Sequence, residues 1–170
     1  MMKMIIHDLN QQEFISLYDN QNTQNTDVTV ISDNGTIRKC IGCFGCWVRT
    51  PGECVIKDGY DNMGELLSKC HELVIISKCV YGSYSPFVCN IVDRSLPYLL
   101  PYFAIKNGET HHRFRYDNKF TLSVHFYGSD ITNAEKETAQ ALVAANSVNL
   151  NSIGNKMYFH NSLQTIKGVI

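Results

Sequence analysis

Short apolar runs that alternate with helical patterns are the feature that most constrains the fold of this chain. The clearest run covers residues 72–78, and residues 27–32 form a second, β-branched run. Residues 3–9, 120–127 and 156–160 read as further strands. Continuous apolar strands separated by helices are typical of a parallel sheet that is covered on both faces.

Four helices are expected between these strands. Asn10 can cap the first helix, over residues 10–16, and the second covers residues 61–70. Pro86 suits the first turn of the third helix, which ends near Leu96, and Thr132 begins the fourth with a capping box. Five strands with these spacings suit the doubly wound order 2-1-3-4-5. We therefore predict an α/β, flavodoxin-like three-layer sandwich, with a five-stranded parallel sheet and helices on both faces.

Three connecting segments carry weaker signals. Residues 19–25 are polar and are expected to form a loop, and residues 36–39 could return from a turn at 33–35 as a short hairpin arm. Residues 106–119 read as a polar, basic insertion that contains the pair His111–His112. A solvated loop is the simplest interpretation of this insertion.

Composition excludes several classes of protein. The chain has 170 residues, which fits one domain over residues 1–170. Its net charge is −1, whereas a duplex-binding domain carries a basic excess, so we expect no nucleic-acid partner. No apolar stretch has the length of a membrane span or of a secretory signal, so we expect no membrane association and a cytoplasmic location.

Four of the 7 cysteines are concentrated in one glycine-rich segment. Cys40, Cys43, Cys46 and Cys54 follow the spacing C-x2-C-x2-C-x7-C. Three closely spaced thiolates and a fourth that returns after a turn are the ligand set of an iron–sulfur cluster. Zinc at the same four ligands and a loop of reduced thiols are the alternatives. The other three cysteines are expected to be small buried hydrophobes.

Two segments together resemble a known family. The cysteine segment continues to Asp58, and residues 77–94 contain Tyr-Gly-Ser-Tyr-Ser-Pro followed by a helix with Asp93-Arg94. Both are similar to the NADPH-dependent FMN reductase family, and in particular to its iron–sulfur flavoprotein-like branch. The resemblance covers residues 40–94 well and the strand and helix over residues 120–149 loosely.

This resemblance implies a cofactor set and an assembly. It implies FMN, a 4Fe–4S cluster on the four cysteines, NAD(P)H as electron donor, and a small-molecule or protein redox partner. It also implies a homodimer or larger homo-oligomer. The flavin ring would lie against the loop after the third strand, formed by Ser77, Lys78, Cys79, Val80, Tyr81, Gly82, Ser83, Tyr84 and Ser85. By strand topology, this loop, the loop after Tyr127 and the cysteine segment are all expected at the carboxyl edge of the sheet.

The loop after the first strand departs from the family pattern. Relatives hold the FMN phosphate there with backbone N–H groups of a loop rich in Gly, Ser, Thr and Arg. The corresponding segment here is Asp8-Leu-Asn-Gln-Gln-Glu13, which has two acidic side chains and no glycine, serine or basic residue. Two functional hypotheses follow. One is an FMN-dependent NAD(P)H oxidoreductase or electron-transfer flavoprotein, and the other is a relative that has lost FMN and acts as a metal-binding or redox-sensing protein without enzymatic activity.

Overall fold

The computed structural model describes residues 2–18, 27–106 and 108–167 of the chain. The predicted loop at 19–25 lies outside the described residues. In chain order, the strands and helices are β1 (Met2–His7), α1 (Gln11–Leu17), β2 (Asp27–Ser32), α2 (Gly45–Val48), α3 (Met63–Lys69), β3 (Cys70–Lys78), α4 (Pro86–Arg94), β4 (Leu99–Lys106), β5 (Glu109–Phe114), β6 (Phe120–Tyr127), α5 (Asn133–Asn149) and β7 (Ser152–His160). Two short 3-10 helices, Leu96–Tyr98 and Leu163–Ile166, complete this list.

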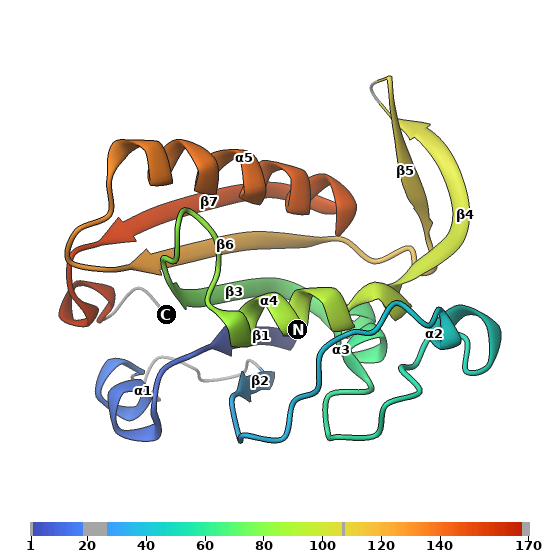
Figure 1. Ribbon diagram of the computed structural model, residues 1–170, viewed down its shortest axis with the longest axis horizontal. Coiled ribbons are helices and arrows are strands. Elements are labelled where there is room, and N and C mark those ends of the chain that lie inside the picture. Colours follow the sequence, from blue (N-terminus) through green and yellow to red (C-terminus); the bar gives the residue numbers. More distant parts are fainter. Residues whose placement is uncertain (1, 19–26, 107, 168–170) are drawn as a thin grey trace.

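The described residues form one parallel sheet of five strands in the order β2-β1-β3-β6-β7. The predicted parallel sheet is confirmed, but the strand numbering differs from the predicted 2-1-3-4-5. The difference arises because β4 and β5 form a separate antiparallel hairpin between α4 and β6. This hairpin projects from the body of the molecule (Figure 1). Helices cover both faces of the sheet, as the predicted sandwich requires, although unequally.

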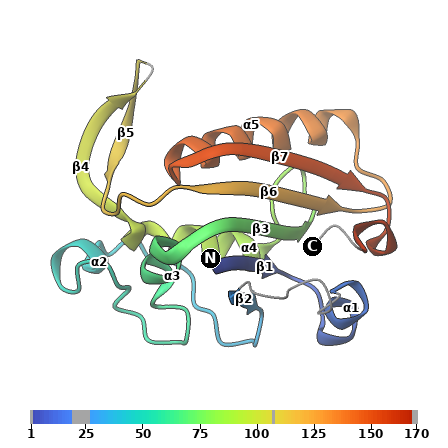
Figure 2. The same cartoon turned by 180° about the vertical axis from the view of Figure 1, so that it is seen from behind.

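The two faces of the sheet differ in how much they are covered. One face packs against α3, α4 and α5 through a large apolar core that includes Leu73, Ile75, Val88 and Val143. Figures 1 and 2 show α4 and α5 on this same side. The opposite face carries Ile5, Val74 and Ile76 against only α1 and the 3-10 helix Leu163–Ile166. Among the described residues, the second layer is therefore thin.

Local sequence signals explain where the predicted helices begin. Asn10 and Glu13 form a capping box at α1, and Thr132 and Glu135 form one at α5, so both predicted caps are confirmed. Pro86 occupies the first turn of α4, as predicted. The predicted hairpin arm over residues 36–39 was wrong. The backbone N–H of Arg38 donates to Asp58, and its carbonyl accepts from Arg94, so this segment pairs with side chains instead of a strand.

None of the helices in the described part of the chain is long and apolar enough to cross a membrane.

Candidate functional site

A crevice lies at the carboxyl edge of the sheet, between the loops that follow β3 and β6. The backbone N–H of Cys79 donates to the Tyr127 carbonyl at 2.9 Å, which holds the two strand ends together. The cavity there has a volume of about 360 Å³. It is lined by Lys78, Cys79, Gly128, Ser129, Asp130, Ile131, Thr132 and Glu135. In doubly wound sheets, ligands bind at this edge, and the volume falls within the range of small-molecule sites.

The loop after β3 forms a tight turn beside this crevice. Val80 and Ser83 exchange two backbone hydrogen bonds of 2.9 Å, with Tyr81 and Gly82 at the tip in left-handed conformations. The backbone N–H of Ser85 donates to the Ser77 hydroxyl oxygen at 2.8 Å, which closes the base of the loop. The turn is thus fixed by its own hydrogen bonds before any ligand binds.

The predicted ring-binding residues of this loop have different environments. Lys78 and Cys79 line the crevice. Tyr84 is buried in the core, where it stacks on Phe126 with ring centroids 5.3 Å apart. Burial raises the pKa of Tyr84 to about 12. Tyr81 is 87% exposed, so it is the one tyrosine of the loop that a ligand could contact freely.

Acidic side chains lie in the loop after β1, where the family resemblance places a flavin phosphate. The Asp8 carboxylate accepts hydrogen bonds from the backbone N–H of Lys78 at 2.8 Å and from the Tyr127 hydroxyl at 3.0 Å. At the start of α1, the Glu13 carboxylate accepts from the backbone N–H of Asn10 at 2.9 Å. The backbone N–H groups of Asn10 and Lys78 are therefore already bound to carboxylates. This segment does not fit a phosphate group, in agreement with its composition.

The tyrosine between the two strand ends is tied to this acidic group. Burial, and secondarily the Asp8 carboxylate, raises the pKa of Tyr127. Its hydroxyl therefore stays protonated and donates to Asp8 near neutral pH. The Asp8–Tyr127 contact links β1 to β6 across the end of β3, which makes the edge of the sheet rigid at this point.

The cysteine segment lies at the opposite edge of the sheet from the crevice. Its short helix α2 is held beside the hairpin, where the Trp47 indole N–H donates to the Leu99 carbonyl at 3.0 Å. Figure 1 shows α2 at the far end of the molecule from α1 and the ends of β6 and β7. The expectation that this segment shares the carboxyl edge with the flavin loop was wrong. Residues 33–44, which include Cys40 and Cys43, carry the chain away from the end of β2 to α2.

The four cysteines of this segment have different environments. Cys40 lines one cavity, beside Gly42 and α4, while Cys43 lines another, beside Val48 and Val55. Cys46 and Cys54 are buried. Burial, with Cys54 as the largest electrostatic contribution, raises the pKa of Cys46 to about 11, so its thiol stays protonated. Within residues 2–18, 27–106 and 108–167, no three His, Cys, Asp or Glu side chains form a group that could hold a metal ion.

A buried ion pair, which sequence patterns did not indicate, holds the cysteine segment on α4. Arg94 is 1% exposed and donates from both terminal nitrogens to Asp58, at 2.8 and 2.9 Å. It also donates to the carbonyls of Arg38 and Ile56, at 2.9 Å each. The family resemblance pointed to Arg94 and Asp58 separately. Their pairing across 36 residues has no local sequence signal.

Comparisons with known proteins define the fold class. No protein-family model and no curated protein matches the chain. Solved structures do match. Azoreductase AzrA has a TM-score of 0.62 at 10% identity, covering 96% of this chain and 89% of that one. The NAD(P)H:quinone oxidoreductase from Methanothermobacter marburgensis has a TM-score of 0.61 at 10% identity, with 95% and 87% covered. An FMN-dependent NADH-azoreductase from Bacillus anthracis str. Ames Ancestor, in complex with FMN, has a TM-score of 0.56 at 9% identity, with 94% and 87% covered.

These similarities extend over nearly the whole chain and confirm a flavodoxin-like fold. Identities near a tenth of the residues establish the fold and not the activity.

Proposed function

We propose that this protein is a flavin-dependent oxidoreductase that takes the flavin ring in the crevice between β3 and β6. The observation that carries the proposal is the cavity of about 360 Å³ at this edge, beside a rigid loop whose Tyr81 side chain is free to cover a planar ligand. The fold similarity supports it, since the matching structures include an azoreductase with FMN and a quinone oxidoreductase. A bound flavin supplies the electron-transfer chemistry, while the protein positions the ring and limits the access of water.

The proposal treats the flavin as an exchangeable ligand held by its ring. Lys78 and Cys79 would contact one side of the ring, and the backbone of residues 128–131 the other. The phosphate end would leave the crevice near Asp8 and Glu13, which have no free donors to offer it. The chain is therefore expected to bind flavins without a phosphate in preference to FMN. The family resemblance suggests three further parts of this proposal. They are NAD(P)H as electron donor, a small-molecule or protein electron acceptor, and a homodimer as the assembly.

The flavin preference can be measured directly by fluorescence titration. Wild-type protein should bind riboflavin about tenfold more tightly than FMN, because a phosphate beside two carboxylates loses about 1 to 2 kcal/mol by repulsion. Asp8→Asn keeps the shape of the side chain and removes its charge. Its single carbonyl oxygen can keep only one of the two hydrogen bonds from Lys78 and Tyr127, so riboflavin affinity reports the loss of the other. The ratio of FMN affinity to riboflavin affinity should rise about threefold.

Asp27→Asn is the matched control for this substitution. It removes the same charge at the other end of a neighbouring strand, where Asp27 is exposed at the start of β2, so it should change neither affinity. Tighter binding of FMN than of riboflavin by the wild-type protein would contradict the proposed orientation of the flavin.

A second candidate function is a redox-sensing or scaffold protein that binds no flavin. The hydrogen bonds of Asp8 to Lys78 and Tyr127 favour it, because they fill the phosphate position with the protein's own side chain. The same titration separates the two candidates. Binding of neither riboflavin nor FMN up to about 100 µM would favour this second function over the first.

Neither of the two candidate functions requires an iron–sulfur cluster. Its four prospective ligands form no metal-holding group among the described residues, and two of them, Cys46 and Cys54, are buried. An anaerobic iron and sulfide assay of the purified protein tests this directly. A stoichiometric cluster would require the cysteine segment to rearrange from the conformation described here.

A further inference from the structure

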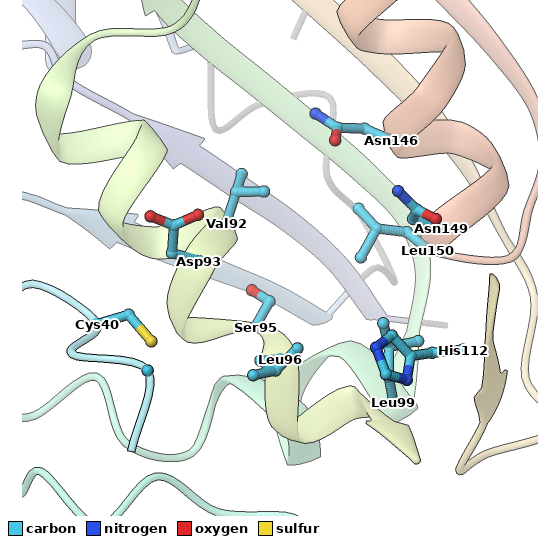
Figure 3. Close-up of a pocket in the computed structure, with 11 residues that line it drawn as sticks. Cys40, Val92, Asp93, Ser95, Leu96, Leu99, His112, Asn146, Asn149 and Leu150 are labelled. Carbon is cyan, nitrogen blue, oxygen red and sulfur yellow. The ribbon is translucent and has the colours of Figure 1, made fainter. Parts of the chain in front are cut away.

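A second cavity, larger than the crevice, lies at the other end of α5. It has a volume of about 440 Å³ and opens between α4, the end of α5, the cysteine segment and the hairpin. Figure 3 shows side chains from these four parts of the chain around one space. The lining residues are Cys40, Gly42, Val92, Asp93, Ser95, Leu96, Leu99, His112, Asn146, Asn149 and Leu150. Neither proposed function uses this cavity.

The polar atoms that remain available around the cavity are mostly hydrogen-bond acceptors. The side chain of Asp93, an exposed residue, makes no ion pair and no hydrogen bond within the described part of the chain, and partial desolvation raises its pKa. Asn146 donates its amide nitrogen to the Tyr84 hydroxyl at 3.3 Å, which leaves its oxygen as the free acceptor. His112 Nδ1 donates to the Leu100 carbonyl at 2.9 Å, so its other ring nitrogen is an acceptor.

The position of these groups is fixed by contacts outside the cavity. The ring of His112 contacts the rings of Trp47 and Phe103, with centroids 4.9 and 4.8 Å away. Asn149 Oδ1 lies 2.9 Å from His111 Nδ1, so the Asn149 amide nitrogen is the donor that remains. Asn146 and Asn149 are three residues apart on α5, which places them on the same helix face. The site is thus organised before a ligand arrives.

The charge and the walls of the cavity define the class of ligand. Asp93 is the only lining residue with a full charge, and no lysine or arginine lines the cavity, so phosphates and carboxylates are disfavoured. Val92, Leu96, Leu99 and Leu150 supply apolar walls on which a ring can pack. A ligand that matches has an aromatic body and an edge rich in N–H donors.

We propose that this cavity binds an aromatic amidine or a related aromatic nitrogen base, with its N–H groups toward Asp93 and Asn146 and its ring against the leucine walls. The site is separate from the flavin crevice and does not depend on the proposed function. It also gives a role to the hairpin and to His112, which the polar composition of residues 106–119 did not suggest.

The test uses benzamidinium as the probe and benzoate as its anionic counterpart of nearly the same shape. Calorimetric titration of the full-length protein should give saturable benzamidinium binding that is at least tenfold tighter than benzoate binding. Asp93→Asn should weaken benzamidinium about threefold, the effect of one partly exposed charge pair. Val92→Phe fills the cavity and should weaken it more than tenfold, with circular dichroism to show that the variant is folded.

Two further readouts locate the binding. Benzamidinium should slow the alkylation of Cys40 by iodoacetamide, measured by tandem mass spectrometry, and leave Cys43 unchanged, because Cys43 lines a different cavity. Saturation with riboflavin should not change the benzamidinium affinity. Undetectable benzamidinium binding, equal binding of benzoate, no effect of Val92→Phe, or competition with riboflavin would each overturn the proposal.

Discussion

Replacing Asp58 by alanine is expected to lower the free energy of unfolding by about 3 to 5 kcal/mol, because it leaves a buried guanidinium without its counter-ion. The side chain of Arg94 is 0% exposed and that of Asp58 is 4% exposed. Solvent cannot replace the two hydrogen bonds that the carboxylate accepts from Arg94. The carboxylate also accepts from the backbone N–H groups of Arg38 and Tyr60, which would lose their partner as well. Urea denaturation measures the effect.

An exposed pair provides the control for this substitution. Glu65 and Lys69 form an i,i+4 pair on α3, with side chains that are 59% and 58% exposed. Glu65→Ala should change the free energy of unfolding by no more than about 0.5 kcal/mol. The double variant Asp58→Leu/Arg94→Met should be clearly more stable than Asp58→Ala, because it removes the unpaired buried charge. Similar costs for Asp58→Ala and Glu65→Ala would contradict the buried geometry.

The Asp58–Arg94 pair should also affect how the free energy of unfolding changes at acid pH. The hydrogen bonds from Arg94 lower the pKa of Asp58 to about 2, below its ordinary value. The folded state thus binds fewer protons at this carboxyl than the unfolded state does, so the stabilisation is complete above about pH 4 and is lost as the pH falls toward 2. In Asp58→Asn, which lacks this titration, the free energy of unfolding should fall less between pH 4 and pH 2. Equal slopes in both proteins would exclude this carboxyl as a source of the acid lability.

The buried strands could be predicted because their sequences report burial directly. Residues 73–77 of β3 are all buried, and a run that contains Leu73, Val74, Ile75 and Ile76 has no other stable place in a small domain. The hairpin β4–β5 was missed for the opposite reason. Tyr102, Phe103 and Ile105 are all more than half exposed, and β5 contains two histidines, so neither strand has the pattern of a buried or half-buried strand. Among the described residues, strand β4 pairs only with β5, the next segment of the chain.

The place of the cysteine segment could not be predicted from strand topology. The rule that ligands lie beyond the carboxyl ends of strands applies to loops that turn straight into a helix. Residues 33–62 instead cross to the other edge and are held there by distant partners, Asp58 on Arg94 and Trp47 on Leu99. Such contacts leave no periodicity in the sequence. The acidic character of the segment after β1, by contrast, could be predicted from composition, and its carboxylates accept hydrogen bonds from the backbone N–H groups of Asn10 and Lys78.

Gly82→Ala is expected to lower the free energy of unfolding by about 2 to 4 kcal/mol. Gly82 has φ +77°, where any residue with a Cβ is strained by about 1 to 2 kcal/mol. A Cβ at this position would also lie 2.6 Å from Thr138 Cβ and 2.7 Å from the Glu135 carbonyl oxygen, both on α5. Such overpacking adds about 1 to 3 kcal/mol, because helix backbone cannot move aside easily.

Gly35 allows the two contributions to be separated. It has the same φ, +77°, but a Cβ there would meet no atom within 4 Å, so Gly35→Ala should cost only the backbone strain. Adding Thr138→Ala to Gly82→Ala should not restore stability, because the Cβ and the Glu135 carbonyl oxygen remain in place. Equal costs for Gly82→Ala and Gly35→Ala would mean that the loop after β3 does not touch α5. The same loop and the start of α5 line the crevice, so under the proposed function Gly82→Ala should also weaken riboflavin binding.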